Sequence, residues 1–441
     1  MGDRAPVITE HEADKLLAPL AAFDGIVLAV SGGPDSMALM HLVAEWNGRH
    51  PKPTRWILVA TVDHGLRRES ASEASFVAQW ATRLEFPCRI VRWEGEKPAR
   101  GLPAAARAAR YELLEGEAAK LGTSSVCLVT AHTQDDQAET FLMRLKRGSG
   151  IDGLSAMAPR TPLREGSAVA LLRPLLCVPK ARLIATLEAR GQTWAEDPSN
   201  TCLDYERPAV RVALTRLADE GISAGAIATS ARRLRAAREA VDYALARFME
   251  TLALSFNDEI FASLSRAAFD EGPEALRARV LAQLIGRFGG ASLPPQLAEV
   301  EDLTARLAAD KRTTSTLGGA IVSATPGDLK IWREPGRIAA APLVLRQPGV
   351  WEVWDRRFRV RSAPGGVGVH VCALGEAARQ ETVAPLLDPR RPLPAAAVAA
   401  LPAFWAGDRL LSVPTLKVYM QSDLAAGLAA HGMEARPLFG Q

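Results

Sequence analysis

One short stretch constrains the fold of this chain more than any other, an apolar run followed by a glycine-rich turn. The run covers residues 26–30 and is long enough for one buried strand, while residues 37–46 carry apolar side chains at helical spacing. The turn between them reads Ser31, Gly32, Gly33, Pro34, Asp35 and Ser36. Glycine lets a backbone approach a ligand closely, and the first N–H groups of a helix point outward, so we expect the turn to bind an anion.

The turn differs from a Walker phosphate loop because it has no lysine and carries Asp35 where a phosphate should lie. A divalent cation between this carboxylate and the phosphates would explain Asp35, since hard cations prefer oxygen ligands. The alternative is a tight turn without a ligand, in which Asp35 caps the helix. The rest of the chain must decide between these interpretations.

Strand-like and helix-like patterns alternate after the turn. The strand-like runs are 56–62, 88–93, 126–131 and 169–172, and the helix-like runs are 70–84, 103–121, 134–147 and 179–190. This alternation predicts an α/β fold with a doubly wound parallel sheet, in which ligands bind beyond the carboxyl ends of the strands. Ser31, Asp63 and His132 each follow a predicted strand, so we expect them at one crevice.

The pattern changes after residue 211, which indicates further domains. At 441 residues the chain is too long for one core. Residues 211–288 look almost wholly helical, and short strand-like runs with frequent proline and glycine follow. We therefore predict a catalytic domain over residues 1–211, a mainly helical domain over 212–340, and a small mixed α/β module over 341–441.

Composition excludes several classes of protein. The net charge is only +3, so contacts with nucleic acid must come from local basic patches. The five cysteines are scattered and never form C-x-x-C, which argues against a disulfide framework and against a thiolate metal site. No stretch approaches the ~20 apolar residues that span a bilayer, and the first residues lack a secretory apolar region. We expect a cytoplasmic protein without membrane contact.

The densest group of reactive side chains lies in residues 132–140. Asp136 and Glu139 are three positions apart and share a helix face, and His132 follows the predicted strand. Such a group could bind a metal ion, position an amine or move a proton. The alternative is structural, because acids in a first helical turn also complement the helix dipole.

Two basic stretches are candidates for RNA contact. The first is a helix end that carries Arg144 and Arg147, and the second places Arg232, Arg235 and Arg238 on one helix face. Both could bind phosphates. Both also have ordinary explanations, since cations favour helix C-termini and charged runs often form solvated faces.

These motifs together resemble a known family. The turn at 31–36 is similar to the loop of the N-type ATP pyrophosphatases, which split ATP between its α and β phosphates and adenylate an oxygen. Further motifs narrow the resemblance to the tRNA(Ile)-lysidine synthases, from about residue 24 to residue 211. These motifs lie at residues 63–66, 106–111, 132–140, 144–150, 173–176 and 197–200, with a weaker similarity at 316–319.

The resemblance implies a reaction, a fold and partners. ATP would activate C2 of the wobble cytidine in the isoleucine tRNA with a CAU anticodon, and free L-lysine would then displace AMP to give lysidine. The implied fold is an adenine nucleotide α hydrolase-like sheet, with ATP and Mg²⁺ as cofactors. Members of the family are often dimeric, so the resemblance also implies a homodimer.

The resemblance also suggests where ATP and Mg²⁺ bind. Residues 31–36 would hold the pyrophosphate, and the backbone at Val62 and His64 would face the adenine or ribose. Asp35 and Asp136 would bind Mg²⁺.

The remaining roles belong to the adenylated intermediate, lysine and tRNA. Arg110 and Arg207 would stabilise the intermediate. Asp136 and Glu139 would bind the lysine amine, and His132 would handle a proton or contact a phosphate. The candidates for tRNA contact are Arg144, Arg147, Arg232, Arg235 and Arg238.

One departure and two alternative functions stay open. Arg207 is followed by Pro208, where the family favours asparagine, which removes an amide side chain and a backbone donor. One alternative is a tRNA cytidine thiolase of the same fold, although such enzymes usually carry paired cysteines. The other is a non-catalytic RNA-binding protein that senses nucleotide.

Overall fold

The computed structural model describes most of the chain as two compact units. The described residues are 5–66, 69–95, 97–98, 101–164, 166–195, 206–362, 368–420 and 432–438. The first unit covers residues 1–238 and the second covers 239–441. The predicted division into three domains, with boundaries at 211 and 340, stays a prediction.

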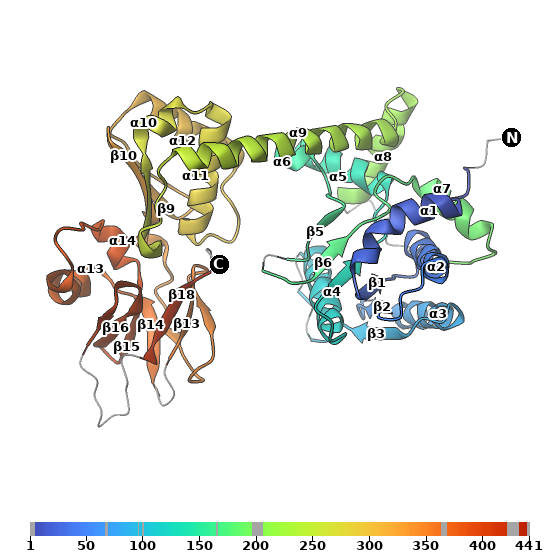
Figure 1. Cartoon of the computed structure of the whole chain (residues 1–441), viewed down its shortest axis with the longest axis horizontal. Coiled ribbons are helices and arrows are strands. Elements are labelled where there is room, and N and C mark those ends of the chain that lie inside the picture. The colour runs from blue at the N-terminus through green and yellow to red at the C-terminus, as the bar shows by residue number, and fades with distance from the viewer. Residues whose placement is uncertain are drawn as a thin grey trace. The chain divides into compact units, whose positions relative to one another are not determined.

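The first unit is built on a six-stranded sheet with the order β3-β2-β1-β4-β6-β5 (Figure 1). Its strands are β1 (Gly25–Ala29), β2 (Trp56–Asp63), β3 (Cys88–Arg92), β4 (Val126–Val129), β5 (Arg160–Pro162) and β6 (Ala170–Leu172). Every pairing is parallel except that of β5 with β6, which is antiparallel. The predicted parallel sheet is confirmed, and β5 is an edge strand that the sequence did not predict.

Helices cover both faces of this sheet, because successive side chains of a strand point to opposite faces. Ile26 and Leu28 of β1 pack into one core, while Val27 packs into another. The first core includes α1 (Glu10–Leu17), α2 (Pro34–Arg49), α3 (Ser70–Arg83) and α7 (Lys180–Glu188), and the second includes α4 (Leu102–Ala119). The sheet is therefore doubly wound.

Four more α-helices lie in the described part of this region. They are α5 (Gln134–Lys146), α6 (Ile151–Leu154), α8 (Glu206–Asp219) and α9 (Ala224–Thr251), the last of which continues into the second unit. No helix among the described residues is long and apolar enough to cross a membrane.

Among its described residues, the second unit contains three antiparallel sheets. The first has the order β7-β10-β9-β8, and its strands are β7 (Phe261–Ser265), β8 (Thr314–Leu317), β9 (Ala320–Ala324) and β10 (Asp328–Arg333). It packs with α11 (Glu274–Gly289) and α12 (Leu297–Ala309) around one core. The prediction of an almost wholly helical region over 211–288 is wrong at β7, because this strand pairs with the distant β10.

The other two sheets enclose the last core. Their orders are β11-β14-β15-β16-β17 and β12-β13-β18. The strands are β11 (Leu343–Val344), β12 (Glu352–Trp354), β13 (Phe358–Arg361), β14 (Val369–Ala373), β15 (Pro402–Ala406), β16 (Arg409–Val413), β17 (Val418–Tyr419) and β18 (Glu434–Pro437). Together with short helices such as α14 (Ala395–Ala399), they form the mixed α/β fold expected of the C-terminal part.

Candidate active site

The glycine-rich turn joins β1 to α2 at the carboxyl edge of the sheet. Gly32 has φ of +89°, a conformation that suits glycine, and Pro34 is the first residue of α2. The turn is closed by its own hydroxyl, since Ser36 Oγ accepts a 3.1 Å hydrogen bond from the Ser31 N–H and donates at 3.0 Å to the Gly33 carbonyl. In the described structure no side chain caps α2, so its first N–H groups remain available to an anion.

Asp35 does not act as the helix cap that the alternative interpretation requires. Its Oδ1 is buried without a hydrogen-bond partner, and its Oδ2 lies 3.4 Å from Lys180 Nζ. Burial raises the pKa of Asp35 to about 6; Lys180 opposes this rise, and the charges of Asp136 and Asp135 add to it. The two predicted metal ligands, Asp35 and Asp136, therefore lie close enough for the charge of one to act on the other.

The neighbouring aspartates at the start of α5 have different partners. Asp136 Oδ2 accepts hydrogen bonds from the N–H of Thr133 at 2.8 Å and from its hydroxyl at 3.0 Å, which caps α5 itself. Asp135 Oδ2 accepts at 2.8 Å from the backbone N–H of Lys180, the first residue of α7. Asp135 therefore ties α5 to α7 and places the Lys180 side chain beside Asp35.

Glu139 is a buried acid with one oxygen occupied. Only 3% of the residue is exposed. Its Oε1 accepts a hydrogen bond from Arg211 Nε at 2.5 Å, and its Oε2 is buried without a partner. Burial raises the pKa of Glu139 and the charge of Asp136 adds to this rise, while Arg211 opposes it. The free oxygen is a buried acceptor that a cationic substrate could satisfy.

His132 is a neutral imidazole. The residue is buried, and its Nδ1 lies 2.8 Å from the hydroxyl oxygen of Thr130. Burial lowers the pKa of His132 to about 3, although the charge of Asp136 acts in the opposite direction. The imidazole therefore offers hydrogen bonds at neutral pH but is a weak base.

His64 follows β2 and lies near the helix that carries Arg110. Its Nδ1 is buried without a partner, and its ring meets Trp93 edge to face with 6.2 Å between the ring centroids. Burial lowers the pKa of His64, and the charge of Arg110 lowers it further. Val62, two residues earlier, is half-buried near the end of β2.

Arg110 and Arg207 complete this group. Arg110 is half-buried and its Nε has no partner, and its positive charge contributes to the low pKa of His132. Arg207, on α8, opposes the rise in the pKa of Glu139. The structure thus gathers the predicted catalytic residues into one electrostatically coupled group, namely Asp35, Arg110, His132, Asp136, Glu139 and Arg207.

The arginines predicted to contact tRNA mostly have partners within the protein. Arg144 donates to the carbonyls of Gly153 and Ala156 at 2.7 and 3.0 Å, and so holds the segment that follows α5. Arg147 pairs with a glutamate of α8 at 2.5 Å.

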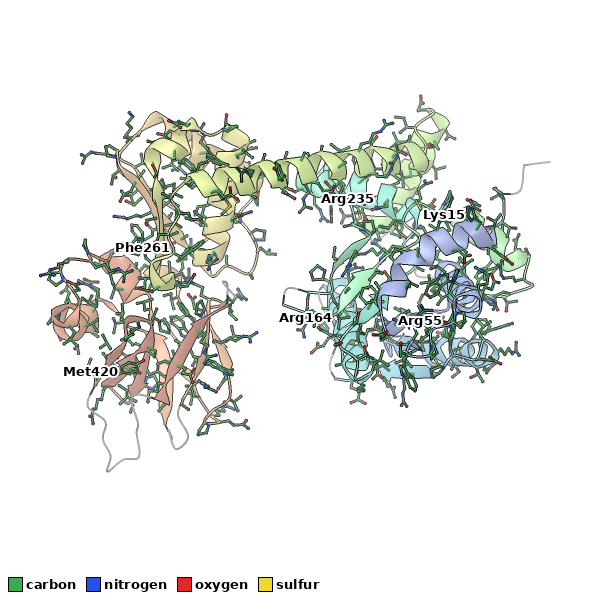
Figure 2. All side chains as sticks on the ribbon, viewed as in Figure 1. Lys15, Arg55, Arg164, Arg235, Phe261 and Met420 are labelled. Carbon is green, nitrogen blue, oxygen red and sulfur yellow. The ribbon has the colours of Figure 1, made fainter. Side chains whose placement is uncertain are left out.

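The arginines of α9 divide between packing and exposure. Arg235 of α9 donates to the Ser155 carbonyl at 3.4 Å beside α6 (Figure 2), and Arg238 pairs with Asp152 of α6 at 3.1 Å. Arg232 is exposed.

Several residues of the site have no role assigned from the sequence, namely Lys180, Arg211, Arg173 and Arg107, although Arg107 and Arg173 lie within the motifs at 106–111 and 173–176. Lys180 lies at the start of a predicted helix. Its backbone N–H needs a hydrogen-bond acceptor there, which could have indicated that an acid from elsewhere in the chain caps this helix. The predicted motif at 197–200 lies outside the described residues. No group of three or more histidine, cysteine or acidic side chains in the described structure is arranged to hold a metal ion by itself.

Replacing Asp35 with asparagine should stabilise the ligand-free protein. Because the folded state raises the pKa of Asp35 above 3.8, it disfavours the charged carboxylate, and this cost is present above pH 6 and absent below pH 4. Only 24% of the side chain is exposed, and we expect a gain of about 1 to 2 kcal/mol. Thermal unfolding of both proteins at pH 8 and pH 4 tests this, and an equal gain at both values would contradict it.

Comparison with known proteins identifies a matching family model and similar sequences. Residues 6–218 match the family model described as the PP-loop domain. A tRNA(Ile)-lysidine synthase of Bradyrhizobium diazoefficiens is 44% identical over 356 residues, which cover 76% of this chain and 96% of that protein. The tRNA(Ile)-lysidine synthase of Ruegeria pomeroyi is 38% identical over 396 residues, covering 88% of this chain and 87% of that protein.

Several solved structures are also similar to this chain, and one of them serves as an example. The U34-tRNA thiolase NcsA from Methanococcus maripaludis, determined with its [4Fe-4S] cluster, aligns with a TM-score of 0.44 and 16% sequence identity. The alignment covers 52% of this chain and 78% of that chain.

Proposed function

We infer the chemistry of this site from one premise, that the chain belongs to the tRNA(Ile)-lysidine synthases, a family of PP-loop ATP-dependent ligases. It is a tRNA-modifying ligase that uses ATP and acts on tRNA(Ile). L-lysine is the proposed amine substrate. The observation that carries the proposal is the uncapped N-terminus of α2 beside the unpartnered oxygen of Asp35.

The reaction joins two displacements. The C2 oxygen of the wobble cytidine attacks the α-phosphorus of ATP, and pyrophosphate leaves. An amine of lysine then attacks C2, and AMP departs with the oxygen. The first step is needed because an amide-like oxygen is a poor leaving group, and the second needs an amine that has lost its proton.

The glycine-rich turn is the proposed site for the pyrophosphate. The N–H groups of the first turn of α2 and the hydroxyl of Ser31 supply donors, while the Ser36 hydroxyl closes the turn, and the helix dipole favours negative charge there. Val62 and His64 at the end of the neighbouring β2 are proposed to face the adenine or ribose. Lys180 adds a positive charge on the same side as Asp35.

The residues present fit a magnesium ion that binds together with the phosphates. Asp35 has a buried oxygen without a partner, and the negative charge of Asp136 lies near it. Carboxylate oxygens are ligands that Mg²⁺ prefers, and an ion that keeps waters and phosphate ligands needs few from the protein. When bound there, Mg²⁺ would offset the charge that develops on the phosphates.

Glu139 and Asp136 are proposed to receive the lysine amine. The free Oε2 of Glu139 gains a partner when an ammonium binds, and its raised pKa makes it a better proton acceptor than an ordinary carboxylate. His132 is a poor acceptor because its pKa is about 3. We therefore propose that His132 holds a substrate oxygen and does not take the proton of lysine.

Arg110 and Arg207 are proposed to stabilise the adenylated intermediate. The charge of Arg207 acts on Glu139 of α5 and that of Arg110 acts on His132, and Arg110 has a buried donor without a partner. A fixed guanidinium near the developing phosphate charge needs no reorganisation during the reaction. A homodimer and a cytoplasmic location also remain proposals.

Nucleoside analysis of tRNA(Ile) after incubation with ATP, Mg²⁺ and lysine tests the function. Lysidine that forms only when all three are present is the expected result. A sulfur-containing product independent of lysine would favour the thiolase, and ATP binding without pyrophosphate release would favour the nucleotide-sensing protein. The sequence itself offers the thiolase no C-x-x-C pair.

Arg232→Ala should weaken tRNA binding by about threefold and lower the slope of log K against log salt by about 0.7 to 0.9, if this exposed arginine contacts one phosphate. Arg235 and Arg238 are less suitable for this test because they hold α6. Fluorescence anisotropy at several salt concentrations measures the slope. An unchanged slope would mean that Arg232 contacts no phosphate and belongs to an ordinary solvated face of α9.

A further inference from the structure

Three arginines surround one tyrosine near the active site. Of these four residues, only Arg110 has a role in the steps proposed above. Arg107 and Arg110 lie on α4 with their guanidinium carbons 5.0 and 5.5 Å from the centroid of the Tyr111 ring. Arg107 also donates to the Tyr111 hydroxyl at 3.2 Å, and Arg173, which follows β6, interacts with the same hydroxyl. We call Arg107, Arg110, Tyr111 and Arg173 the arginine–tyrosine cluster.

The positive charge of this cluster is only partly compensated within the described residues, where the charge of Asp136 acts on Arg107. There, none of its arginines forms an ion pair with a carboxylate. Arg173 is 8% exposed, and the Nε groups of Arg110 and Arg173 are buried without a hydrogen-bond partner. Buried cations and donors are costly when they are unpaired. A bound anion would remove that cost.

The cluster lies where an anion could meet the reacting groups. The charges of Arg107, Arg110 and Arg173 all lower the pKa of His132, at the end of β4, and Arg110 acts in the same way on His64, at the end of β2. Arg107 is exposed, so the cluster is open to a ligand from solvent. Guanidinium forks suit phosphate and carboxylate oxygens.

The proposed reaction brings three kinds of anion to the site. The polyphosphate of ATP already has a proposed binding site at the turn before α2, beside Lys180. The carboxylate of lysine would enter together with its amine near Glu139, where Arg211 supplies a cation. The remaining anions are the phosphodiesters of the RNA, which must enter with the target base.

We propose that the arginine–tyrosine cluster binds a phosphodiester that flanks the target cytidine in the anticodon loop. This inference rests on the proposed function, because it takes tRNA as the substrate. The target base must reach the α-phosphate of ATP, and the two phosphodiesters beside it are the anions that travel with it. Proteins commonly read such unpaired loops through phosphate contacts together with aromatic and arginine planes.

A thermodynamic cycle between protein and RNA tests the contact. Full-length tRNA(Ile) is assembled by ligation with one neutral methylphosphonate on the 5′ or the 3′ side of the target cytidine. Its affinity for wild-type protein and for Arg107→Gln is measured by fluorescence anisotropy without ATP or lysine. We expect about tenfold weaker binding from Arg107→Gln with native tRNA, and about tenfold from one of the two neutral linkages with wild-type protein.

The decisive measurement combines the Arg107→Gln protein with the tRNA that carries the neutral linkage. Arg107→Gln and that linkage together should weaken binding no more than either change alone, because each removes the same contact. Arg107→Lys should recover part of the loss, since it keeps the charge without the fork. Arg89→Gln, which alters an exposed arginine on β3, should bind as wild type does.

Two outcomes would overturn the proposal. One is that the loss of tRNA affinity from Arg107→Gln adds to the loss from each of the two neutral linkages. That result would mean that Arg107 contacts neither phosphate. The other is a loss of ATP affinity, measured by calorimetry, or a raised KM for lysine while tRNA affinity stays unchanged. Because the tRNA measurement needs no turnover, a wild-type protein that binds tRNA but forms no lysidine would defeat the proposed function and leave this result standing.

Discussion

Asp35→Asn is expected to lower the rate of lysine incorporation into tRNA(Ile) by about 10³-fold. The change keeps the size of the side chain and removes its charge, so a loss of rate reports the carboxylate itself. Asp35 lies in the first turn of α2 with a buried oxygen that has no partner, beside the negative charge of Asp136. Incorporation of radiolabelled lysine measures the rate. Calorimetry with and without Mg²⁺ measures the metal dependence of ATP binding, which the variant should lose.

The matched control is Asp219→Asn, which removes an exposed acid at the end of α8 and should leave the rate unchanged. A rate for Asp35→Asn within tenfold of wild type would remove Asp35 from the metal and phosphate site. The variant should also melt above wild type at pH 8. Loss of activity in a more stable protein would show that the carboxylate is kept for chemistry at a cost in stability.

Glu139→Gln is expected to raise the KM for lysine by about 30- to 100-fold, with a smaller effect on the KM for ATP. The side chain is 3% exposed and keeps one oxygen without a partner, where a lysine ammonium would form a charged hydrogen bond. Glutamine retains the shape and removes the charge. Initial rates at saturating ATP and tRNA measure the KM for lysine.

The ion pair with Arg211 requires a separate control, because Glu139→Gln also leaves that guanidinium without its carboxylate. Arg211→Met breaks the same pair but keeps the charge of Glu139, so it should raise the KM for lysine by less. Equal effects of the two changes would mean that Glu139 serves only to position α8. An unaltered KM in Glu139→Gln would remove this residue from the amine site.

The sheet of the first unit could be predicted because its central strands are nearly continuous apolar runs. Residues 26–28 and 126–130 are buried, and helices with a different period separate the two strands. The strands β5 and β7 could not be predicted in this way. β5 has only three residues at an exposed edge, and β7 exists because it pairs with β10, far away in the sequence.

The chemistry of the site could be predicted by residue type but not by partner. Spacing placed Asp136 and Glu139 on one helix face, and the structure confirms that their charges interact. Nothing in the spacing showed that Asp135 caps another helix, or that Glu139 pairs with Arg211. These contacts join segments 45 and 72 residues apart, and only the folded chain brings such segments together.

The position of Lys180 has a consequence for the resting enzyme. Its ammonium lies 3.4 Å from Asp35, so the chain's own counter-ion balances part of the negative charge of this carboxylate. A chelator such as EDTA should therefore leave the melting temperature of the nucleotide-free protein unchanged. The metal-free protein would stay folded when divalent ions are scarce and would regain activity when they are supplied again.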